Sequence, residues 1–394
     1  MSPTENPDQL TAPDAHPVAS TPAFEPRPFI PRRFLSNRHL QTILGNMLPR
    51  PNHLLPPTPE LVEVSPASGS QIATQVLCHC HWQPAEVRSQ RLTAILLHGL
   101  EGSSDSQYVI GNANKLWRAG ANIIRMNMRN CGGPNYKMAA LSPTLYHSGL
   151  SGDVDAVMRF FLSRERLQSI ALVGYSMGGN LVLKLAGEFG PNPPHELHSV
   201  VGVSPAMDLD ASATALHQLE NRLYERRFLR ALLKRFRRKT TLFPRAYDPN
   251  RATGIRSLRE FDDRITSLYS GFKSADDYYY RAAAARVLDR IAIPTLILHA
   301  LDDPFVRLIE STRATIATNP NITFIETLHG GHCAFLAQPN AATGNDGYWA
   351  EHTALRFIFE HAPENLGFPS RSLAIGLHQA APSQTLPRSE SEIL

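Results

Sequence analysis

The chain has 394 residues, of which 42% are hydrophobic and 19% are charged. This balance excludes a wholly disordered chain, and no apolar run reaches the roughly 18 residues that a membrane-spanning helix needs. The formal net charge of +4, from 39 basic and 35 acidic side chains, is too small for a chain of this length to indicate a nucleic-acid partner.

The cysteine content and the two ends of the chain indicate the cellular compartment in which we expect the protein. Four cysteines are too few for a disulfide scaffold and favour a reducing compartment with free thiols. The first twenty residues contain no basic segment followed by an apolar core, so they do not resemble a secretory signal. Ser2 does not fit N-myristoylation, and the final SEIL does not fit prenylation. We therefore expect a cytoplasmic protein.

Residues 1–31 are rich in proline and poor in large apolar side chains, which predicts a flexible tail. Two runs then alternate between polar and apolar residues, 61–66 and 71–82, and predict an antiparallel pair of strands at one edge of a sheet. Six continuous apolar runs follow, at 92–99, 122–128, 169–176, 199–205, 294–300 and 322–327. Runs of this kind are typical of strands buried on both faces of a parallel sheet.

Helical patterns separate the apolar runs, at 106–119, 149–164, 178–189, 305–317 and 349–361. Alternation of strand and helix predicts the α/β class, with a doubly wound and mostly parallel sheet. Residues 32–363 are expected to form this domain. The weak pattern of residues 364–394 predicts a second flexible tail.

Residues 206–290 contain no strand pattern, so we expect a helical cap inserted over the carboxyl edge of the sheet. Within it, residues 221–239 carry nine Lys or Arg and one Glu, with apolar residues at roughly helical spacing. This stretch has two interpretations. It is a cap helix with one face on the core and a solvated basic face, or it contacts an anionic membrane surface peripherally.

The clearest chemical motif is Gly-Tyr-Ser-Met-Gly-Gly at 174–179, between an apolar strand and a helical segment. A tight turn from strand to helix projects the hydroxyl of Ser176 above the sheet, and the glycines leave room for the turn. Ser176 is therefore the predicted nucleophile. The N–H of Met177, at the start of the helix, is a predicted donor to an oxyanion.

A serine nucleophile needs a base and an acid. His332 is the predicted base, because it follows two glycines in the loop after the last strand, and His329 is a rival. Asp303, beyond the strand at 294–300, is the predicted acid. Asp302 is expected to brace the same loop, and Asp208 is a weaker candidate for the acid.

The second oxyanion donor is expected in the loop after the strand at 92–99, where the sequence reads His-Gly-Leu-Glu-Gly-Ser. Gly99 allows the backbone to turn, so the N–H of Leu100 is the predicted donor. His98 is interpreted as structural. This interpretation rests on its place before the turn.

Two other signals are discounted. Cys78, His79, Cys80 and His81 suggest zinc, but alternate residues of a strand face opposite sides and no second ligand pair follows at zinc-ribbon spacing. Cys333 lacks the strand–turn–helix context of a nucleophile. No metal and no cofactor are therefore expected.

At these motifs the sequence resembles the α/β-hydrolase superfamily, and within it the YheT-like branch that includes ABHD1- and ABHD3-type enzymes (the AB hydrolase 4 family). The matching blocks are Asn37–Thr42, HGLEGS (98–103), NMRNCGG (127–133), YHSG (146–149), GYSMGGN (174–180), REFDDRIT (259–266), HALDDPF (299–305) and HGGHCAF (329–335). The resemblance implies a serine hydrolase of acyl esters with Ser176, Asp303 and His332 as the triad. One departure is Asn130, where the family usually has glycine.

The residues and the resemblance together predict a carboxylic ester hydrolase that cleaves short- to medium-chain acyl esters through an acyl-enzyme. The expected partner is a small-molecule or lipid acyl ester. The alternatives are transfer of the acyl group to an alcohol, deacylation of phospholipids, and a non-catalytic scaffold that binds acyl ligands or membranes. An intact set of Ser, Asp and His argues against the scaffold.

Overall fold

The computed structural model describes residues 24–69, 72–133, 137–340 and 344–363. The predicted tails lie outside the described residues at 1–23 and 364–394. In the described part of the chain, eight strands form one sheet in the order β1-β2-β4-β3-β5-β6-β7-β8. Their bounds are Thr58–Ser65, Thr74–His81, Thr93–Leu97, Asn122–Met126, Ile170–Tyr175, Leu197–Val203, Thr295–Ala300 and Ile322–Thr327 for β1 to β8.

The pairing of the strands agrees with the hydrophobic pattern. β1 and β2 form an antiparallel pair at one edge, and β2 is also antiparallel to β4. The remaining pairs, from β4 through to β8, are parallel. Every residue of β3, β4, β5 and β7 is buried, as continuous apolar runs predict for the centre of a parallel sheet. The predicted mostly parallel α/β sheet is confirmed.

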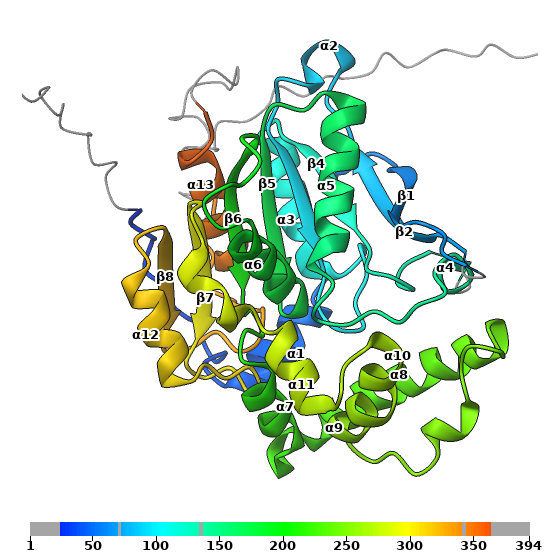
Figure 1. Ribbon diagram of the computed structural model, residues 1–394. Helices are drawn as coiled ribbons and strands as arrows, with labels where there is room; N and C mark the ends of the chain where they lie inside the picture. Colours follow the sequence, from blue (N-terminus) through cyan, green and yellow to red (C-terminus); the bar gives the residue numbers. More distant parts are fainter. Residues whose placement is uncertain (1–23, 70–71, 134–136, 341–343, 364–394) are drawn as a thin grey trace, which may run out of the picture.

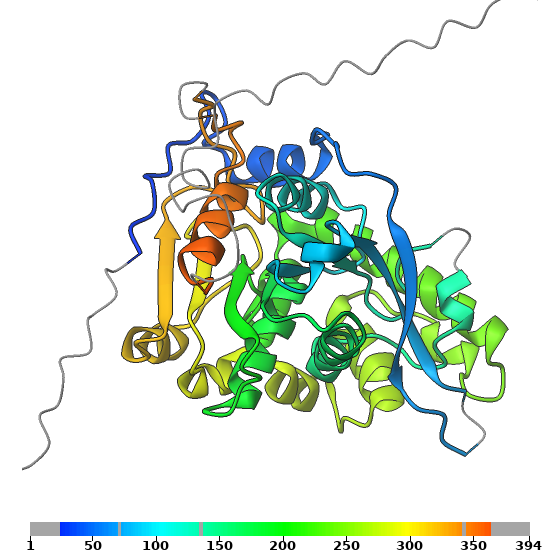
Figure 2. The ribbon, with the colours of Figure 1, turned by 90° about the horizontal axis from the view of Figure 1, so that it is seen from above.

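Helices cover both faces of the sheet (Figure 1 and, from above, Figure 2). α5 and α6 pack on one face with α12, and α3 and α13 pack on the other. The bounds are Arg38–Met47 for α1, Gln107–Arg118 for α3, Ser151–Glu165 for α5, Met177–Phe189 for α6, Glu310–Thr318 for α12 and Trp349–Glu360 for α13; α2 (Ala85–Arg88) and α4 (Lys137–Ala140) are short.

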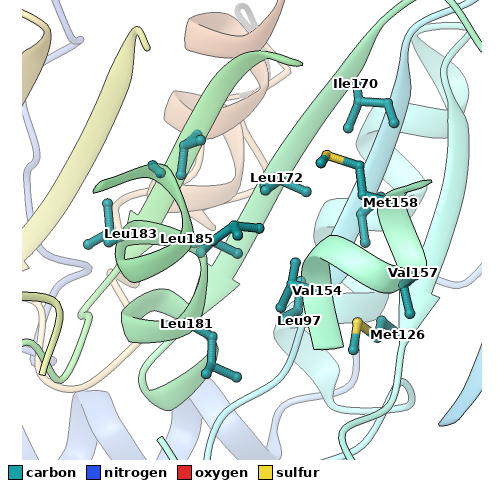
Figure 3. Packing of buried hydrophobic residues seen from close by; sticks show 14 of the residues in the cluster. Leu97, Met126, Val154, Val157, Met158, Ile170, Leu172, Leu181, Leu183 and Leu185 are labelled. Carbon is teal, nitrogen blue, oxygen red and sulfur yellow. The ribbon is translucent and has the colours of Figure 1, made fainter. Parts of the chain in front are cut away.

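The larger apolar core lies between the sheet and the pair α5 and α6. Figure 3 shows Met158 of α5 and Leu185 of α6 reaching toward Leu172 of β5. All three side chains are buried. Burial of a leucine or methionine contributes about 1.5–3 kcal/mol, so this layer fixes β5 and α6 relative to each other. The turn between these two elements is where the predicted nucleophile lies.

Between β6 and β7 the chain is helical. It forms α7 (Leu209–His217), α8 (Arg222–Leu242), α9 (Leu258–Phe261), α10 (Ser267–Ser270) and α11 (Ala275–Ala282). A π-helix (Asp262–Thr266) joins α9 directly to α10. Figure 1 shows these helices gathered beyond the carboxyl edge of the sheet. A separate apolar cluster holds them together, and it includes Phe236 and Phe261. We call this segment the cap. No helix in the described ranges is both long and apolar enough to cross a membrane.

Residues 24–31 correct the predicted boundary of the amino-terminal tail. Phe24 packs edge-on against Phe357 of α13, and Phe29 packs against Trp349, with ring centroids 5.3 and 5.5 Å apart. The indole N–H of Trp349 donates to the carbonyl of Arg27 at 2.8 Å. The ordered domain therefore begins by residue 24. Two aromatic side chains are enough to fix a proline-rich segment whose backbone forms no helix.

Candidate active site

Ser176 lies at the turn between β5 and α6. Its backbone has φ 54° and ψ −117°, a conformation that residues other than glycine rarely adopt. A side chain on Gly174 would clash with the carbonyl oxygen of Gly178, and one on Gly178 would clash with that of His98. The two glycines therefore allow the turn. It places Ser176 at the amino end of α6, where unpaired N–H groups favour negative charge.

Asp303 and His332 are joined by a hydrogen bond. Asp303 follows β7, His332 follows β8, and the imidazole Nδ1 lies 2.7 Å from Asp303 Oδ2. Asp303 is fully buried. Its other oxygen accepts from the N–H groups of Phe305 and Val306 at 3.0 and 2.8 Å, which fixes the carboxylate. Because Nδ1 is occupied, Nε2 is the ring nitrogen that remains for other partners.

Ser176 and the His332 loop meet at one carbonyl group. The N–H of Ser176 donates to Val203 O at 2.9 Å, and the thiol of Cys333 lies 3.7 Å from the same oxygen. Nε2 of His332 lies 3.6 Å from Cys333 Sγ. Within the described residues, no hydrogen bond joins Ser176 Oγ to His332. The structure thus brings Asp303 and His332 into contact and places Ser176 at the same edge of the sheet.

Burial and charge act in opposite directions on His332. Burial lowers its pKa, whereas the interaction with Cys333, the negative charge of Asp303 and the hydrogen bonds with both raise it. The net result is a pKa of about 10. The imidazole is therefore protonated near neutral pH in this arrangement. It becomes a proton acceptor as the pH rises.

The loop after β3 packs directly against the serine turn. A Cβ added to Gly99 would lie 3.0 Å from Ser176 Cβ, so only glycine allows this close an approach. Leu100 and Met177 line the same cavity as Ser176. In the described part of the chain, no acceptor is present for the N–H of Leu100 or of Met177. Both groups can therefore donate to an anionic oxygen.

His98 has the structural role that its position predicts. Its Nε2 accepts from the N–H of Met128 at 3.1 Å, so Nδ1 carries the proton and donates to Gly99 O at 2.7 Å. Burial lowers its pKa to about 4, which keeps the ring neutral. The imidazole thus joins the loop after β3 to the end of β4.

Glu101, the next residue in that loop, is held by the cap. Arg235 of α8 forms a two-point ion pair with it, with Nε to Oε1 at 2.9 Å and Nη2 to Oε2 at 3.0 Å. Tyr146 donates to Glu101 Oε1 at 2.5 Å, and Arg235 also donates to Asn130 O. The charged side chains are only 13% and 12% exposed, and Glu101 has φ 56°. We call this pair the Glu101–Arg235 clamp.

The cavity at Ser176 has a volume of about 120 Å³ and lies between the sheet and the cap. Its wall is mainly apolar. The cap contributes Leu209, Leu216, Phe228, Leu232, Phe236, Leu258, Phe261 and Tyr279 to the lining. Phe305, whose ring packs 4.3 Å from that of His332, also lines it. The arrangement suits a molecule with a reactive centre at Ser176 and an apolar portion under the cap.

The rival residues have other partners. Asp302 accepts from the N–H of Gly331 at 2.9 Å and lies 3.3 Å from His329 Nδ1, so it connects its own loop to the histidine loop, a contact that the sequence did not predict. Asp208 accepts from the N–H of Ile309 and the hydroxyl of Thr312. It therefore connects the cap to the segment before α12.

Sequence reasoning missed the support that α1 gives to the histidine loop. Thr42 Oγ1 accepts a hydrogen bond from the N–H of His332 at 2.9 Å. The side-chain amide of Gln41 accepts from the N–H of Leu336 and donates to its carbonyl oxygen. Both side chains are buried. The sequence analysis identified the block Asn37–Thr42 as a family motif, but its polar residues do not indicate which part of the fold it contacts.

The cysteine signals have simple structural explanations. Cys78, Cys80, Cys131 and Cys333 are free thiols and all are buried. Among the described residues, no group of three or more His, Cys, Asp or Glu is arranged to hold a metal ion. Cys333 is of interest only through its contact with His332.

The comparisons with known proteins agree with the fold and the motifs. The model of the alpha/beta hydrolase fold family matches residues 95–339. The putative esterase YheT of Escherichia coli is 32% identical over 333 residues, which cover 83% of this chain and 91% of YheT. Phospholipase ABHD3 of Bos taurus is 29% identical over 69% of this chain and 65% of its own length.

One further relative is more distant. Human monoacylglycerol lipase ABHD2 is 25% identical over 62% of this chain and 60% of its own length. The match to the family model covers more than half of the chain, and the match to YheT covers most of both proteins. The chain therefore belongs to the α/β-hydrolase family, as a hydrolase of the group that contains YheT and ABHD3.

Proposed function

We propose that this protein is a serine esterase that hydrolyses short- to medium-chain carboxylic esters. The observation that carries the proposal is the position of Ser176. It lies on a strained turn that lines an apolar cavity, at the same edge of the sheet as the hydrogen-bonded pair of Asp303 and His332. The names of the relatives, an esterase and two lipid hydrolases, support the same reaction class.

In the proposed reaction, Ser176 Oγ attacks the ester carbonyl carbon and its proton passes to His332 Nε2. The oxyanion accepts hydrogen bonds from the N–H groups of Leu100 and Met177. The carbon–oxygen ester bond then breaks, and the alcohol leaves with the proton from His332. Water attacks the acyl-enzyme with the same imidazole as base, and the carboxylic acid leaves. Asp303 holds the imidazole in the required tautomer throughout.

The size of the cavity supports the proposed chain length. A volume of about 120 Å³ is well below the roughly 300–1,000 Å³ of pockets that enclose drug-sized ligands. A panel of nitrophenyl esters of increasing acyl length should therefore give the highest kcat/KM at short to medium chains. Activity that rises steadily to long chains would contradict this part of the proposal.

A fluorophosphonate probe tests the nucleophile. We expect the wild-type protein to be labelled, and Ser176→Ala to lose the labelling, because only a serine with an activated hydroxyl attacks the phosphorus. Ser148→Ala is the matched control: Ser148 lines the same cavity but is not on the turn, so its variant should still be labelled. A folded wild-type protein that takes no label would instead support a non-catalytic scaffold.

Two other reactions of the same acyl-enzyme are separated by product analysis. Ethanol added to the assay would yield an ethyl ester if the enzyme transfers acyl groups to alcohols. A panel of phospholipids would release fatty acid if it acts as a phospholipase, as ABHD3 is named. With hydrolysis of short- to medium-chain esters as the main reaction, the carboxylic acid remains the principal product when ethanol is added, and the phospholipids release little fatty acid.

The contact between Cys333 and His332 leads to a prediction about pH. Because the base must be unprotonated, we expect kcat/KM to rise with pH through the alkaline range, in line with the pKa of about 10 for His332. Cys333→Ala removes a group that raises this pKa. The midpoint of the profile should therefore move to lower pH, and activity near neutral pH should increase.

Cys78→Ala is the control for the loss of a buried thiol, because Cys78 lies in β2. Its pH profile should match that of the wild type. If Cys333→Ala leaves the midpoint where it was, Cys333 does not influence the base.

A further inference from the structure

The outer face of α8 is a cationic surface. Of the nine Lys or Arg residues at 221–239, Arg235 and Lys239 turn inward, and the other seven are exposed. These seven, which we call the cationic face, are Arg222, Arg226, Arg227, Arg230, Lys234, Arg237 and Arg238. Within the described residues, none of the six arginines has a carboxylate within ion-pair distance. Their charge is therefore not neutralised by the protein.

Glu225, the acidic residue of α8 among residues 221–239, does not reduce the charge of the cationic face. Glu225 is buried on the inner face, where Oε1 accepts from the N–H of Leu258 at 3.0 Å and Oε2 lies 3.0 Å from His217 Nδ1. It lies in a buried stripe with Leu229, Phe236 and Lys239, at successive spacings of four, seven and three residues along the helix. The helix thus separates its charges, with the acid and two of the cations inside and the other seven cations outside.

Two large apolar side chains lie beside the cationic face. Leu219, just before α8, is 80% exposed, and Leu223 in its first turn is 79% exposed. They lie four residues apart, Leu219 in a short 3₁₀ turn and Leu223 in the first turn of α8. Exposed leucines adjoining a cationic helix face are typical of helices that lie in a membrane interface. A nucleic-acid backbone offers such side chains no apolar partner.

The inner face of the same helix forms part of the cavity wall. Phe228, Leu232, Arg235 and Phe236 line the cavity at Ser176. Since a helix with its side chains is about 10–12 Å across, the cationic face lies about one helix thickness from the cavity. A lipid surface on that face would lie close to the site where acyl groups are expected to bind.

We propose that α8 docks this protein on an anionic lipid bilayer, with its arginines at the phosphate groups and Leu219 and Leu223 inserted among the lipids. Docking rests on charge and exposed surface and does not require the proposed esterase reaction. Each basic residue near such a surface contributes about a fivefold increase in affinity. The six exposed arginines are enough to hold the protein reversibly.

Vesicle sedimentation tests the docking. We expect the wild-type protein to bind vesicles that contain phosphatidylglycerol at low salt, to bind pure phosphatidylcholine vesicles weakly, and to be released by about 0.5 M NaCl, which screens the charges. The variant Arg226→Gln, Arg227→Gln, Arg230→Gln should bind anionic vesicles about a hundredfold more weakly. Hydrolysis of a soluble ester should persist in this variant, since none of the three lines the cavity.

The control variant removes the same charge from the opposite edge of the sheet. Arg118, Arg166 and Arg290 are exposed and precede β4, β5 and β7. Changing these three to Gln should leave vesicle binding unchanged. Equal binding by both triple variants, or equal wild-type binding to neutral and anionic vesicles, would overturn the proposal.

A second variant distinguishes lipid from nucleic acid. Leu219→Ser with Leu223→Ser keeps every charge, so it should bind anionic vesicles more weakly than the wild type while binding a single-stranded oligonucleotide no differently. If the oligonucleotide binds the wild type as tightly as the vesicles do, and the leucine variant binds both normally, the cationic face serves nucleic acid and the lipid proposal is wrong. A loss of soluble-ester activity would bear on the proposed reaction and not on docking.

Discussion

Replacing Asp303 by asparagine is expected to lower kcat on a soluble ester about ten-thousandfold. The amide has the size of the carboxylate, and its oxygen can still accept from the N–H groups of Phe305 and Val306. The amide nitrogen, however, donates toward His332 Nδ1. The imidazole then carries its own proton on Nε2, where it cannot accept one from Ser176. Steady-state kinetics on a short nitrophenyl ester measure the effect, and KM should change little.

Asp302→Asn is the matched control for this prediction. Asp302 is the adjacent residue, and its carboxylate also reaches the histidine loop, through Gly331 and His329. It does not contact His332, so we expect a loss of less than about tenfold. Comparable losses in the two variants would mean that the loop needs bracing in general, and would contradict an individual role for Asp303.

The sign of the pH effect gives an independent check. The Asp303 carboxylate raises the pKa of His332, so its loss should lower the midpoint of the remaining activity. Asp302→Asn should keep the wild-type midpoint. A profile for Asp303→Asn that stays in the alkaline range would show that other groups determine the protonation of His332.

The sheet could be predicted because its strands are short apolar runs. Burial on both faces demands such runs, and each of the eight predicted strands is present within a few residues of its expected bounds. The helix predicted at 305–317 instead begins at Glu310. The backbone N–H groups of Phe305 and Val306 bond to Asp303, so the first residues of that pattern are held in a turn. These hydrogen bonds, which fix Asp303 in the candidate site, therefore override the local preference of the residues for a helix.

The inner face of α1 could not be predicted from its pattern. Leu40, Ile43, Leu44 and Met47 have helical spacing, but the first two and Met47 are exposed, and the buried residues are Gln41, Thr42 and Gly45. Gly45 packs against Ala334, where a side chain would clash. Polar residues are buried here because they satisfy the backbone of the histidine loop, and that requirement appears only when the chain is folded.

The contacts between the cap and the sheet also could not be predicted from the sequence. The residues that form the candidate nucleophile, acid and base each lie beside a strand end, and parallel strands bring those ends to one edge. Arg235, the partner of Glu101, has no such relation, because it lies in α8 of the cap and not at a strand end. In the sequence, Arg235 is one of nine similar basic residues. The inward direction of its side chain depends on how α8 is seated.

The Glu101–Arg235 clamp leads to the second large expected effect. Glu101 follows Leu100, whose N–H is the proposed oxyanion donor, and its backbone has φ 56°. The clamp holds the residue in that conformation from the cap side. Removing one oxyanion donor typically costs about 10²–10³ in rate. We therefore expect kcat to fall about a hundredfold when the clamp is removed, with a smaller change in KM.

The variant must not leave one charge buried alone, since that costs about 3–5 kcal/mol in stability. Arg235→Met with Glu101→Gln removes both charges at similar volume, so the double variant should remain folded, with a thermal midpoint near that of the wild type. Each single variant should be less stable than the double. Thermal unfolding and single-turnover kinetics on the same samples measure stability and chemistry separately.

Arg259→Met with Asp276→Asn is the control for removing an ion pair of the cap. This pair is on the surface, with side chains 40% and 81% exposed, and neither residue lines the cavity. Its kcat should stay within about threefold of the wild type, because exposed pairs contribute little. If the clamp variant is folded and keeps its full kcat, the pair only attaches the cap. A fall in kcat in a fully folded clamp variant would instead establish that the cap positions the loop that holds the oxyanion.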